Sequence, residues 1–147
     1  PVLGTTTVGH ADGTTMHRFV AGSRETRRVR ASATVDLATA TMACTDPAMF
    51  RTPSERAAFD AVRTSVRLTR YDGDCANYGG VAAGFIDLVV EHQLQPYDIV
   101  PLVPILEGAG AVITAADGGS PLDGGWVVAA ATAELHAAAL EQIRRAS

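Results

Sequence analysis

Apolar residues recur with two different periods along the chain after about residue 40. Segments in which they lie three or four positions apart predict amphipathic helices, whereas short, mostly apolar or alternating runs predict strands. The predicted strands are 40–45, 66–71, 85–91, 111–114 and 126–131, and the predicted helices are 52–66, 72–84, 98–107 and 132–145. Strands that alternate with helices in this way indicate an α/β fold with a mostly parallel sheet. Residues 1–32, rich in Thr, Gly and Arg, predict strands and turns.

Local signals place the start of two of these helices. Thr52 or Ser54 can cap the helix over 52–66, where Pro53 suits the first turn. Asp98 can cap the helix over 98–107, because Pro101 then falls in the first turn, where backbone N–H groups have no partner in the helix. Pro104 lies further along, and we expect it to remove one hydrogen bond and bend the helix.

Composition and charge narrow the class of protein. A chain of 147 residues with 47% apolar and 19% charged residues is typical of one globular domain. No apolar run reaches the roughly 20 residues that cross a bilayer, so we expect no membrane partner. A net charge of −4 argues against nucleic-acid binding. With only Cys44 and Cys75, no disulfide framework is expected, and a reducing cytoplasm is the expected location.

Three carboxylates stand at the ends of predicted elements. Asp74 precedes a helix, Glu91 ends a strand and Asp98 begins the next helix. In open α/β sheets, ligands bind at the carboxyl ends of strands, so these three side chains could converge. Aspartates at such a place suit Mg²⁺, which binds one or two carboxylates together with phosphate oxygens and water. Helix capping, worth about 1 kcal/mol, explains the same positions without a ligand.

Other chemistry is weakly signalled. Cys75 stands at a helix start, but no histidine is placed to activate it, and we expect a small buried residue. The four histidines show no metal-ligand spacing. Asp12-Gly13-Thr14 could begin a phosphate-binding turn, but a plain turn is favoured.

Several linked motifs over residues 71–114 are far more specific. They are Gly73-Asp74-Cys75, AAG at 82–84, DLVVE at 87–91, LQPYD at 94–98 and LVPILEGAG at 102–110. With these motifs the chain resembles the inositol monophosphatase superfamily of Mg²⁺-dependent sugar phosphatases, and within it the histidinol-phosphate phosphatase branch. The resemblance implies that 33–147 form the C-terminal α/β substrate-binding domain of the layered sugar-phosphatase fold. It implies that 1–32 are the end of an incomplete N-terminal metal-binding α+β layer.

The resemblance also implies roles for individual residues. Asp98 matches a metal-ligand aspartate for Mg²⁺, with Mn²⁺ as an alternative ion. The substrate-binding residues that it implies are Arg70, Gly73, Asp74, Cys75 and Glu91. An acidic Asp74 would suit the ammonium group of histidinol phosphate. In this family the metal activates a water that attacks the phosphate, and no covalent protein nucleophile is needed.

The chain also departs from the family pattern. The other metal ligands of the family come from an upstream glutamate and an Asp-Pro-x-Asp-Gly-Thr motif, and neither is in this sequence. We therefore expect the C-terminal part of a histidinol-phosphate phosphatase, inactive alone. Its expected partners are the missing N-terminal region, a small phosphorylated substrate and, as is common in the family, a second copy in a homodimer. The alternatives are a phosphatase for inositol monophosphate or another small sugar phosphate, and a non-catalytic α/β binding module.

Overall fold

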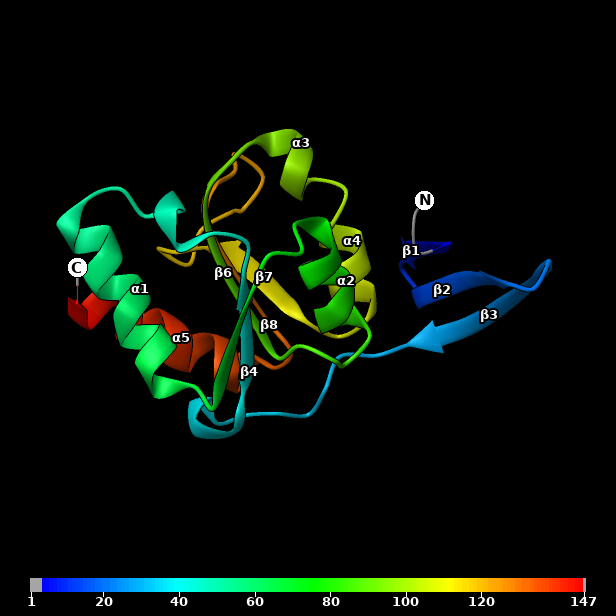
Figure 1. Ribbon diagram of the computed structural model, residues 1–147, viewed down its shortest axis with the longest axis horizontal. Helices are drawn as coiled ribbons and strands as arrows, with labels where there is room; N and C mark the ends of the chain where they lie inside the picture. The colour runs from blue at the N-terminus through cyan, green and yellow to red at the C-terminus, as the bar shows by residue number, and fades with distance from the viewer. Residues whose placement is uncertain (1–3, 147) are drawn as a thin grey trace.

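A computed structural model describes residues 4–146 and shows two separate sheets. The first is a three-stranded antiparallel sheet made of β1 (Thr5–His10), β2 (Gly13–Val20) and β3 (Ser23–Val29). Its β2–β3 hairpin projects from the body of the molecule (Figure 1). The strands and turns predicted for the first 32 residues are confirmed within the described part, and Asp12 lies in the plain turn between β1 and β2.

The second sheet has five strands in the order β5-β4-β6-β8-β7. Their bounds are β4 (Thr41–Cys44), β5 (Leu68–Tyr71), β6 (Leu88–Leu94), β7 (Val112–Ala115) and β8 (Gly125–Ala130). β4 pairs in parallel with both β5 and β6. β8 runs antiparallel to its two neighbours, so β7 points in the same direction as β6. The predicted α/β fold is confirmed, but the sheet is mixed, because two of its four strand pairings are parallel and two are antiparallel.

Helices cover both faces of this sheet (Figure 1). α1 (Pro53–Ser65) and α5 (Ala133–Ala146) pack on one face, and α2 (Cys75–Ala82) and α4 (Val103–Gly108) pack on the other. Each face of the sheet has its own hydrophobic core, and successive side chains of β6 point alternately into one core and the other. Leu88 and Val90 face α1 and α5, whereas Val89 faces α2 and α4. Within residues 4–146, no helix is long and apolar enough to span a bilayer.

The ends of α1 and α5 follow their local sequence signals. The Thr52 hydroxyl accepts the N–H of Glu55 at 3.2 Å, and the Glu55 carboxylate accepts the N–H of Thr52 at 2.9 Å. This reciprocal pair is a capping box, with Pro53 in the first turn as predicted. Thr132 caps α5 by accepting the N–H of Leu135 at 3.2 Å.

Two predicted elements need correction. The strand expected at 85–91 is displaced: Phe85, which is 69% exposed, lies in the turn after α2, and β6 runs from Leu88 to Leu94. The helix expected at 98–107 is wrong, since the chain forms α3 (Pro96–Ile99) and then, separately, α4. Pro101 has no N–H to continue the α3 ladder, and Pro104 occupies the first turn of the second helix instead of bending one long helix.

Candidate active site

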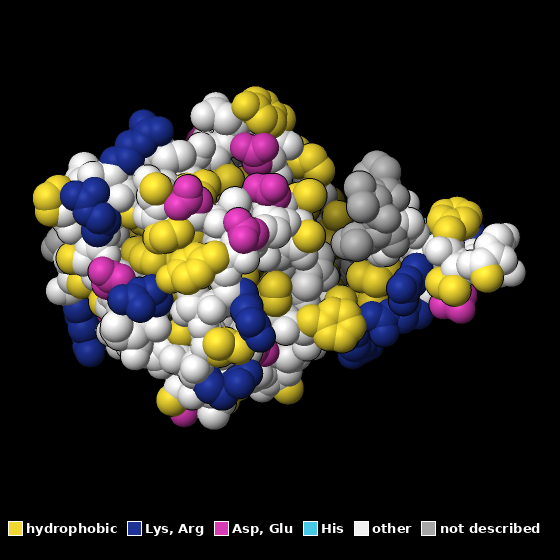
Figure 2. Space-filling model, viewed as in Figure 1, with side chains coloured by type: hydrophobic (Ala, Val, Ile, Leu, Met, Phe, Trp, Pro, Cys, Tyr) yellow, Lys and Arg dark blue, Asp and Glu magenta, His cyan; other side chains and the backbone are white. Residues whose placement is uncertain are grey.

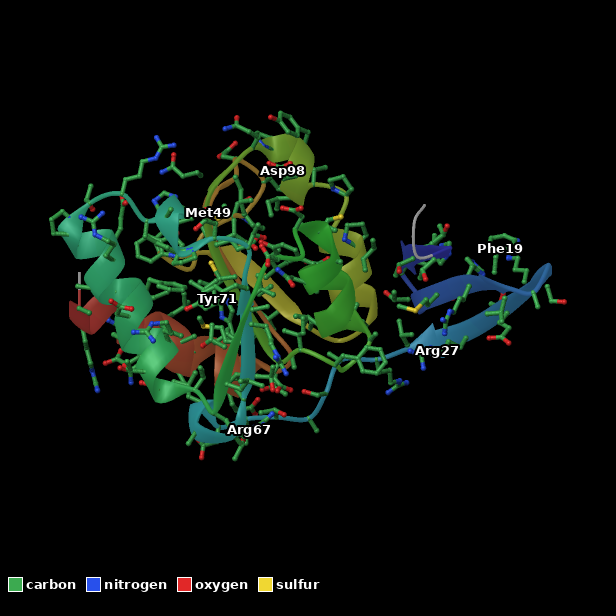
Figure 3. The ribbon with its side chains drawn as sticks, viewed as in Figure 1. Phe19, Arg27, Met49, Arg67, Tyr71 and Asp98 are labelled. Carbon is green, nitrogen blue, oxygen red and sulfur yellow. The ribbon has the colours of Figure 1, made fainter. Side chains whose placement is uncertain are left out.

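A pocket of about 370 Å³ lies where the parallel strands end. β4 leads to Thr45, β5 leads to the loop before Asp74, and β6 carries Glu91 at the fourth of its seven positions. Figure 3 shows Met49 and Asp98 at this same end of the sheet. The lining residues are Thr45, Met49, Asp74, Cys75, Tyr78, Glu91, Gln93, Leu94, Asp98 and Leu102. The predicted convergence of Asp74, Glu91 and Asp98 is therefore what the structure shows.

Glu91 forms the floor of the pocket and is only 1% exposed. Its Oε1 accepts hydrogen bonds from the backbone N–H of Thr45 at 2.9 Å and from the Thr45 hydroxyl at 2.5 Å. Its Oε2 accepts the hydroxyl of Tyr78 at 2.9 Å. About four acceptor positions are available on a carboxylate, so the protein itself occupies three of them. Glu91 thus joins the end of β4 and helix α2 to β6 at the pocket.

Burial of this network changes the acidity of its neighbours. Burial, and then the nearby Glu91 carboxylate, raise the pKa of Tyr78 well above its ordinary value of 10.0. The phenol therefore stays protonated and donates to Glu91 throughout the neutral range. The same two causes, in the same order, raise the pKa of Cys44 to about 12, which makes this buried thiol inert as a nucleophile.

The loop before α2 holds Asp74 in an unusual backbone conformation. Asp72, Gly73 and Asp74 all have positive φ, at 65°, 113° and 45°. A Cβ at Gly73 would lie 2.4 Å from Oδ1 of Asn77, whose amide nitrogen donates to the Asp72 carbonyl at 3.0 Å. The backbone N–H of Asp74 donates to the Thr45 hydroxyl at 3.1 Å, which ties the loop to the Glu91 network.

The side chain of Asp74 is free for a ligand. Asp74 stands at the N-cap position of α2, but its carboxylate makes no capping hydrogen bond, so capping does not explain this residue. Within residues 4–146, no hydrogen bond or ion pair engages this exposed side chain. An exposed carboxylate at a pocket wall, without a partner, is able to accept hydrogen bonds from a cationic ligand.

Asp98 lies on α3 above the pocket (Figure 3). It is in the first turn of α3, not at the cap position expected from the sequence. Its Oδ2 accepts the backbone N–H of Gln95 at 2.8 Å, and this bond holds the carboxylate at the start of the helix. No bond to Oδ1 is formed in the described part of the chain, and that oxygen remains open to a further ligand.

The other predicted site residues fall in different places. Arg70 is exposed on β5 and is not among the residues that line the pocket. Gly73 is not in the lining either, and its contribution is the shape of the loop. Cys75 lines the pocket but is exposed, so the expectation of a buried residue is wrong. Cys75 occupies the first turn of α2, where it is exposed to solvent.

Three polar residues of the lining are not among the site residues predicted from the sequence. No motif in the sequence marks Tyr78, Thr45 or Gln93 as a ligand-binding residue. Thr45 is 46 residues away from the carboxylate that it binds, and the pairing of β4 with β6 that joins them carries no local sequence signal. The alternation of β6 could have indicated that Glu91 points with Val89 toward α2.

The pocket is acidic. Among residues 4–146, its lining contains three carboxylates and no lysine, arginine or histidine. Acidic side chains gather on this part of the surface, below α3 (Figure 2). An all-acidic site attracts cations and repels a free phosphate ester.

The residues present do not complete a magnesium site. Within residues 4–146, no group of three His, Cys, Asp or Glu side chains is close enough to hold a metal ion. Asp98 offers one open oxygen, whereas Mg²⁺ needs six ligands, which it takes from one or two carboxylates, phosphates and water. The described residues alone therefore do not fit the ion.

Comparison with known proteins finds related phosphatases. The chain is 39% identical over 111 residues to the chloroplastic bifunctional phosphatase IMPL2 of Arabidopsis thaliana, in a match that covers 67% of this chain and 31% of the relative. An inositol monophosphatase from Zymomonas mobilis superposes with a TM-score of 0.77 at 30% identity, over 89% of this chain and 53% of that one. An inositol monophosphatase from Anabaena, at 24% identity and a TM-score of 0.73, shares the fold over 90% of this chain and 57% of its own.

These matches show the family of the chain and how much of its relatives' length the chain spans. The chain spans about half the length of the solved relatives and about a third of the plant phosphatase. The sequence model of the inositol monophosphatase family matches residues 19–146, which include β3, the whole five-stranded sheet and helices α1 to α5. The chain therefore belongs to the inositol monophosphatase family.

Proposed function

We propose that this chain supplies the substrate-binding side of a metal-dependent phosphomonoester hydrolase whose substrate is histidinol phosphate, in histidine biosynthesis. Its relatives include a bifunctional phosphatase and inositol monophosphatases, which supports phosphatase chemistry. The observation that carries the proposal is the charge of the pocket, whose lining, in the described part of the chain, has three carboxylates and no basic side chain.

The charge of the pocket supports a requirement for cations. A phosphate ester carries about −1.5 to −2 charges at neutral pH. Like charges about 4 Å apart repel by about 1 kcal/mol in water and about 4 kcal/mol near a protein surface. Cations bound together with the phosphate would offset this repulsion. Mg²⁺ does this in phosphate sites, and Mn²⁺ can replace it.

Asp98 is the proposed metal ligand in this chain. Its Oδ1 is open, and the Gln95 N–H on Oδ2 fixes the direction of the carboxylate. The remaining ligands would come from polypeptide outside the described residues, which we propose to be an N-terminal region of the same protein. This division of ligands agrees with a chain that spans about half of its solved relatives.

Asp74 supports histidinol phosphate over a neutral polyol phosphate. Histidinol carries an ammonium group, and its imidazole is partly protonated near neutral pH. The unpartnered Asp74 carboxylate would bind such a cation, while inositol offers only hydroxyl groups. Met49, Leu94 and Leu102 add apolar walls that suit the carbon skeleton of the alcohol.

Two other functions stay as alternatives. Inositol monophosphate, or another small sugar phosphate, would use the same metal chemistry with a neutral alcohol. A non-catalytic α/β binding module is favoured by one specific observation, namely that the described residues hold no three-ligand metal cluster.

The test is phosphate release by the full-length protein. With Mg²⁺ we expect a higher kcat/KM on histidinol phosphate than on inositol monophosphate, and loss of both activities with a chelator. A higher kcat/KM on inositol monophosphate would sink the substrate assignment. If neither ester is hydrolysed and titration with Mg²⁺ or Mn²⁺ shows no binding, the non-catalytic module is the better account.

A further inference from the structure

Gln93 has a backbone conformation that its side chain does not favour. Its φ is +61°, in the left-handed region that glycine adopts readily and other residues avoid. It lies in β6 where the pairing with β8 shifts register between Glu91 and Leu94, as in a β-bulge. Bulges are common beside active sites, where they change the direction of a side chain.

Some residues other than glycine have a positive φ, and two of them line the pocket. Four such residues occur within the described range: Ala21, Asp72, Asp74 and Gln93. Ala21 lies in the tip of the β2–β3 hairpin, whereas Asp74 and Gln93 both line the pocket. Strained backbone persists where the surrounding structure imposes it, and it concentrates at functional sites.

Packing on the far side of β6 holds the Gln93 backbone in place. Its N–H, which the bulge frees from the strand ladder, donates to Nδ1 of His92 at 2.7 Å. The imidazole stacks on Trp126, with ring centroids 5.3 Å apart, and its Nε2 lies 3.5 Å from Oε1 of Glu55. The aromatic packing and α1 thus support the bulge from outside the pocket.

The side chain of Gln93 is available for a ligand, unlike most polar groups of the pocket. Glu91, Thr45 and Tyr78 bind one another. The Gln93 amide is exposed at the pocket wall, and within residues 4–146 no hydrogen bond engages it. A primary amide both accepts and donates, so it can bind an ammonium group through its oxygen and a hydroxyl or imidazole nitrogen through its NH₂ group.

We propose that Gln93 determines substrate specificity: the bulge directs its amide into the pocket, where it hydrogen-bonds the polar head of the substrate alcohol beside Asp74. This inference rests on the proposed phosphatase function, because it concerns the alcohol portion of the same phosphate ester. Gln93 acts on binding of the alcohol and not on the reacting phosphate, so its removal should raise KM and leave kcat nearly unchanged.

Substitutions at Gln93 separate the effect of the side-chain amide from the effect of the backbone conformation. Gln93→Gly keeps the left-handed conformation and removes the side chain, and Gln93→Asn keeps an amide in a residue that tolerates this conformation. Ala21→Gly relieves the same kind of strain in the hairpin, away from the pocket. Both glycine variants should have a Tm equal to or a few degrees above that of the wild type. A clearly lower Tm for Gln93→Gly would overturn the claim that surrounding structure imposes the conformation.

Turnover and binding are measured separately on the full-length protein. For histidinol phosphate, Gln93→Gly should raise KM about tenfold with kcat within about twofold, Gln93→Asn should recover part of the loss, and Ala21→Gly should match the wild type. Calorimetric titration of histidinol should show the same order of affinities. Equal KM and equal histidinol affinity for wild type and Gln93→Gly would overturn the inference while leaving the phosphatase function standing. If the wild type binds histidinol through Gln93 but hydrolyses no phosphomonoester, the proposed phosphatase function alone would be overturned. If the wild type does not bind histidinol at all, the proposed role of Gln93 would be overturned.

Discussion

The hydrogen bond from Tyr78 to Glu91 gives the sharpest test of the pocket floor. The Tyr78 side chain is 2% exposed and its hydroxyl lies 2.9 Å from Oε2 of Glu91, which has no other donor in the described range. Tyr78→Phe removes only the hydroxyl and leaves a buried carboxylate oxygen without a donor. A hydrogen bond to a charged group is worth about 1.5–3 kcal/mol, so we expect a loss of about 2 kcal/mol in the free energy of unfolding.

The expected loss is large enough to measure by two methods. For a protein of this size, about 1 kcal/mol shifts Tm by about 2–4 °C, so Tm should fall by about 4–8 °C. The midpoint of urea unfolding should fall without a change in the slope with denaturant concentration. Because burial raises the pKa of Tyr78, the loss should be the same at every pH in the neutral range.

Tyr97→Phe is the matched control. Tyr97 is 75% exposed on α3, next to the same pocket, and removal of its hydroxyl should change the unfolding free energy by less than about 0.5 kcal/mol. If Tyr78→Phe is no more destabilising than Tyr97→Phe, then Glu91 is not held by Tyr78, and the account of the pocket floor fails.

Three further changes probe other parts of the fold. A thiol reagent should label Cys75 alone in the folded protein, because Cys44 is buried and has a pKa of about 12. After unfolding, the reagent should label both thiols. Labelling of Cys44 in the folded protein would contradict this prediction. Burial lowers the pKa of His136 below 6.5, so the unfolded state binds the proton more tightly, and the free energy of unfolding should decline as pH falls below 6.5. The variant His136→Gln should reduce this decline. An unchanged dependence of stability on pH in this variant would refute the assignment to His136. Gly73→Ala should cost more than about 1 kcal/mol in urea unfolding, because φ is +113° and the new Cβ would meet Asn77; a neutral effect would show that the loop relaxes freely.

Features that depend on neighbouring residues could be predicted from the sequence, whereas features that depend on tertiary contacts could not. The capping box of α1 lies within four residues, Thr52 to Glu55, and could be recognised directly. The break between α3 and α4 was missed because Asp98 resembles a cap, while the N-terminal turn actually begins at Pro96. Only the tertiary positions of these two short helices show which proline begins a helix and which one separates the two helices.

The site was predictable in outline for a similar reason. The rule that ligands gather at strand carboxyl ends brought Asp74, Glu91 and Asp98 together. The rule could not show that Glu91 is occupied by Thr45 and Tyr78, since this depends on the register of β4 against β6. The positive φ of Gln93 also has no sequence signal, because neither glycine nor asparagine stands at that position.

Substrate selectivity of an Asp74 variant tests the central claim most directly. The claim is that an acidic pocket uses the free Asp74 carboxylate to select a cationic alcohol, so Asp74→Asn in the full-length protein should lower kcat/KM for histidinol phosphate about tenfold, equivalent to about 1.4 kcal/mol. The value for inositol monophosphate should not fall, and Asp117→Asn, an exposed site outside this pocket, should leave both values unchanged. An unchanged ratio of the two kcat/KM values in Asp74→Asn would contradict the account.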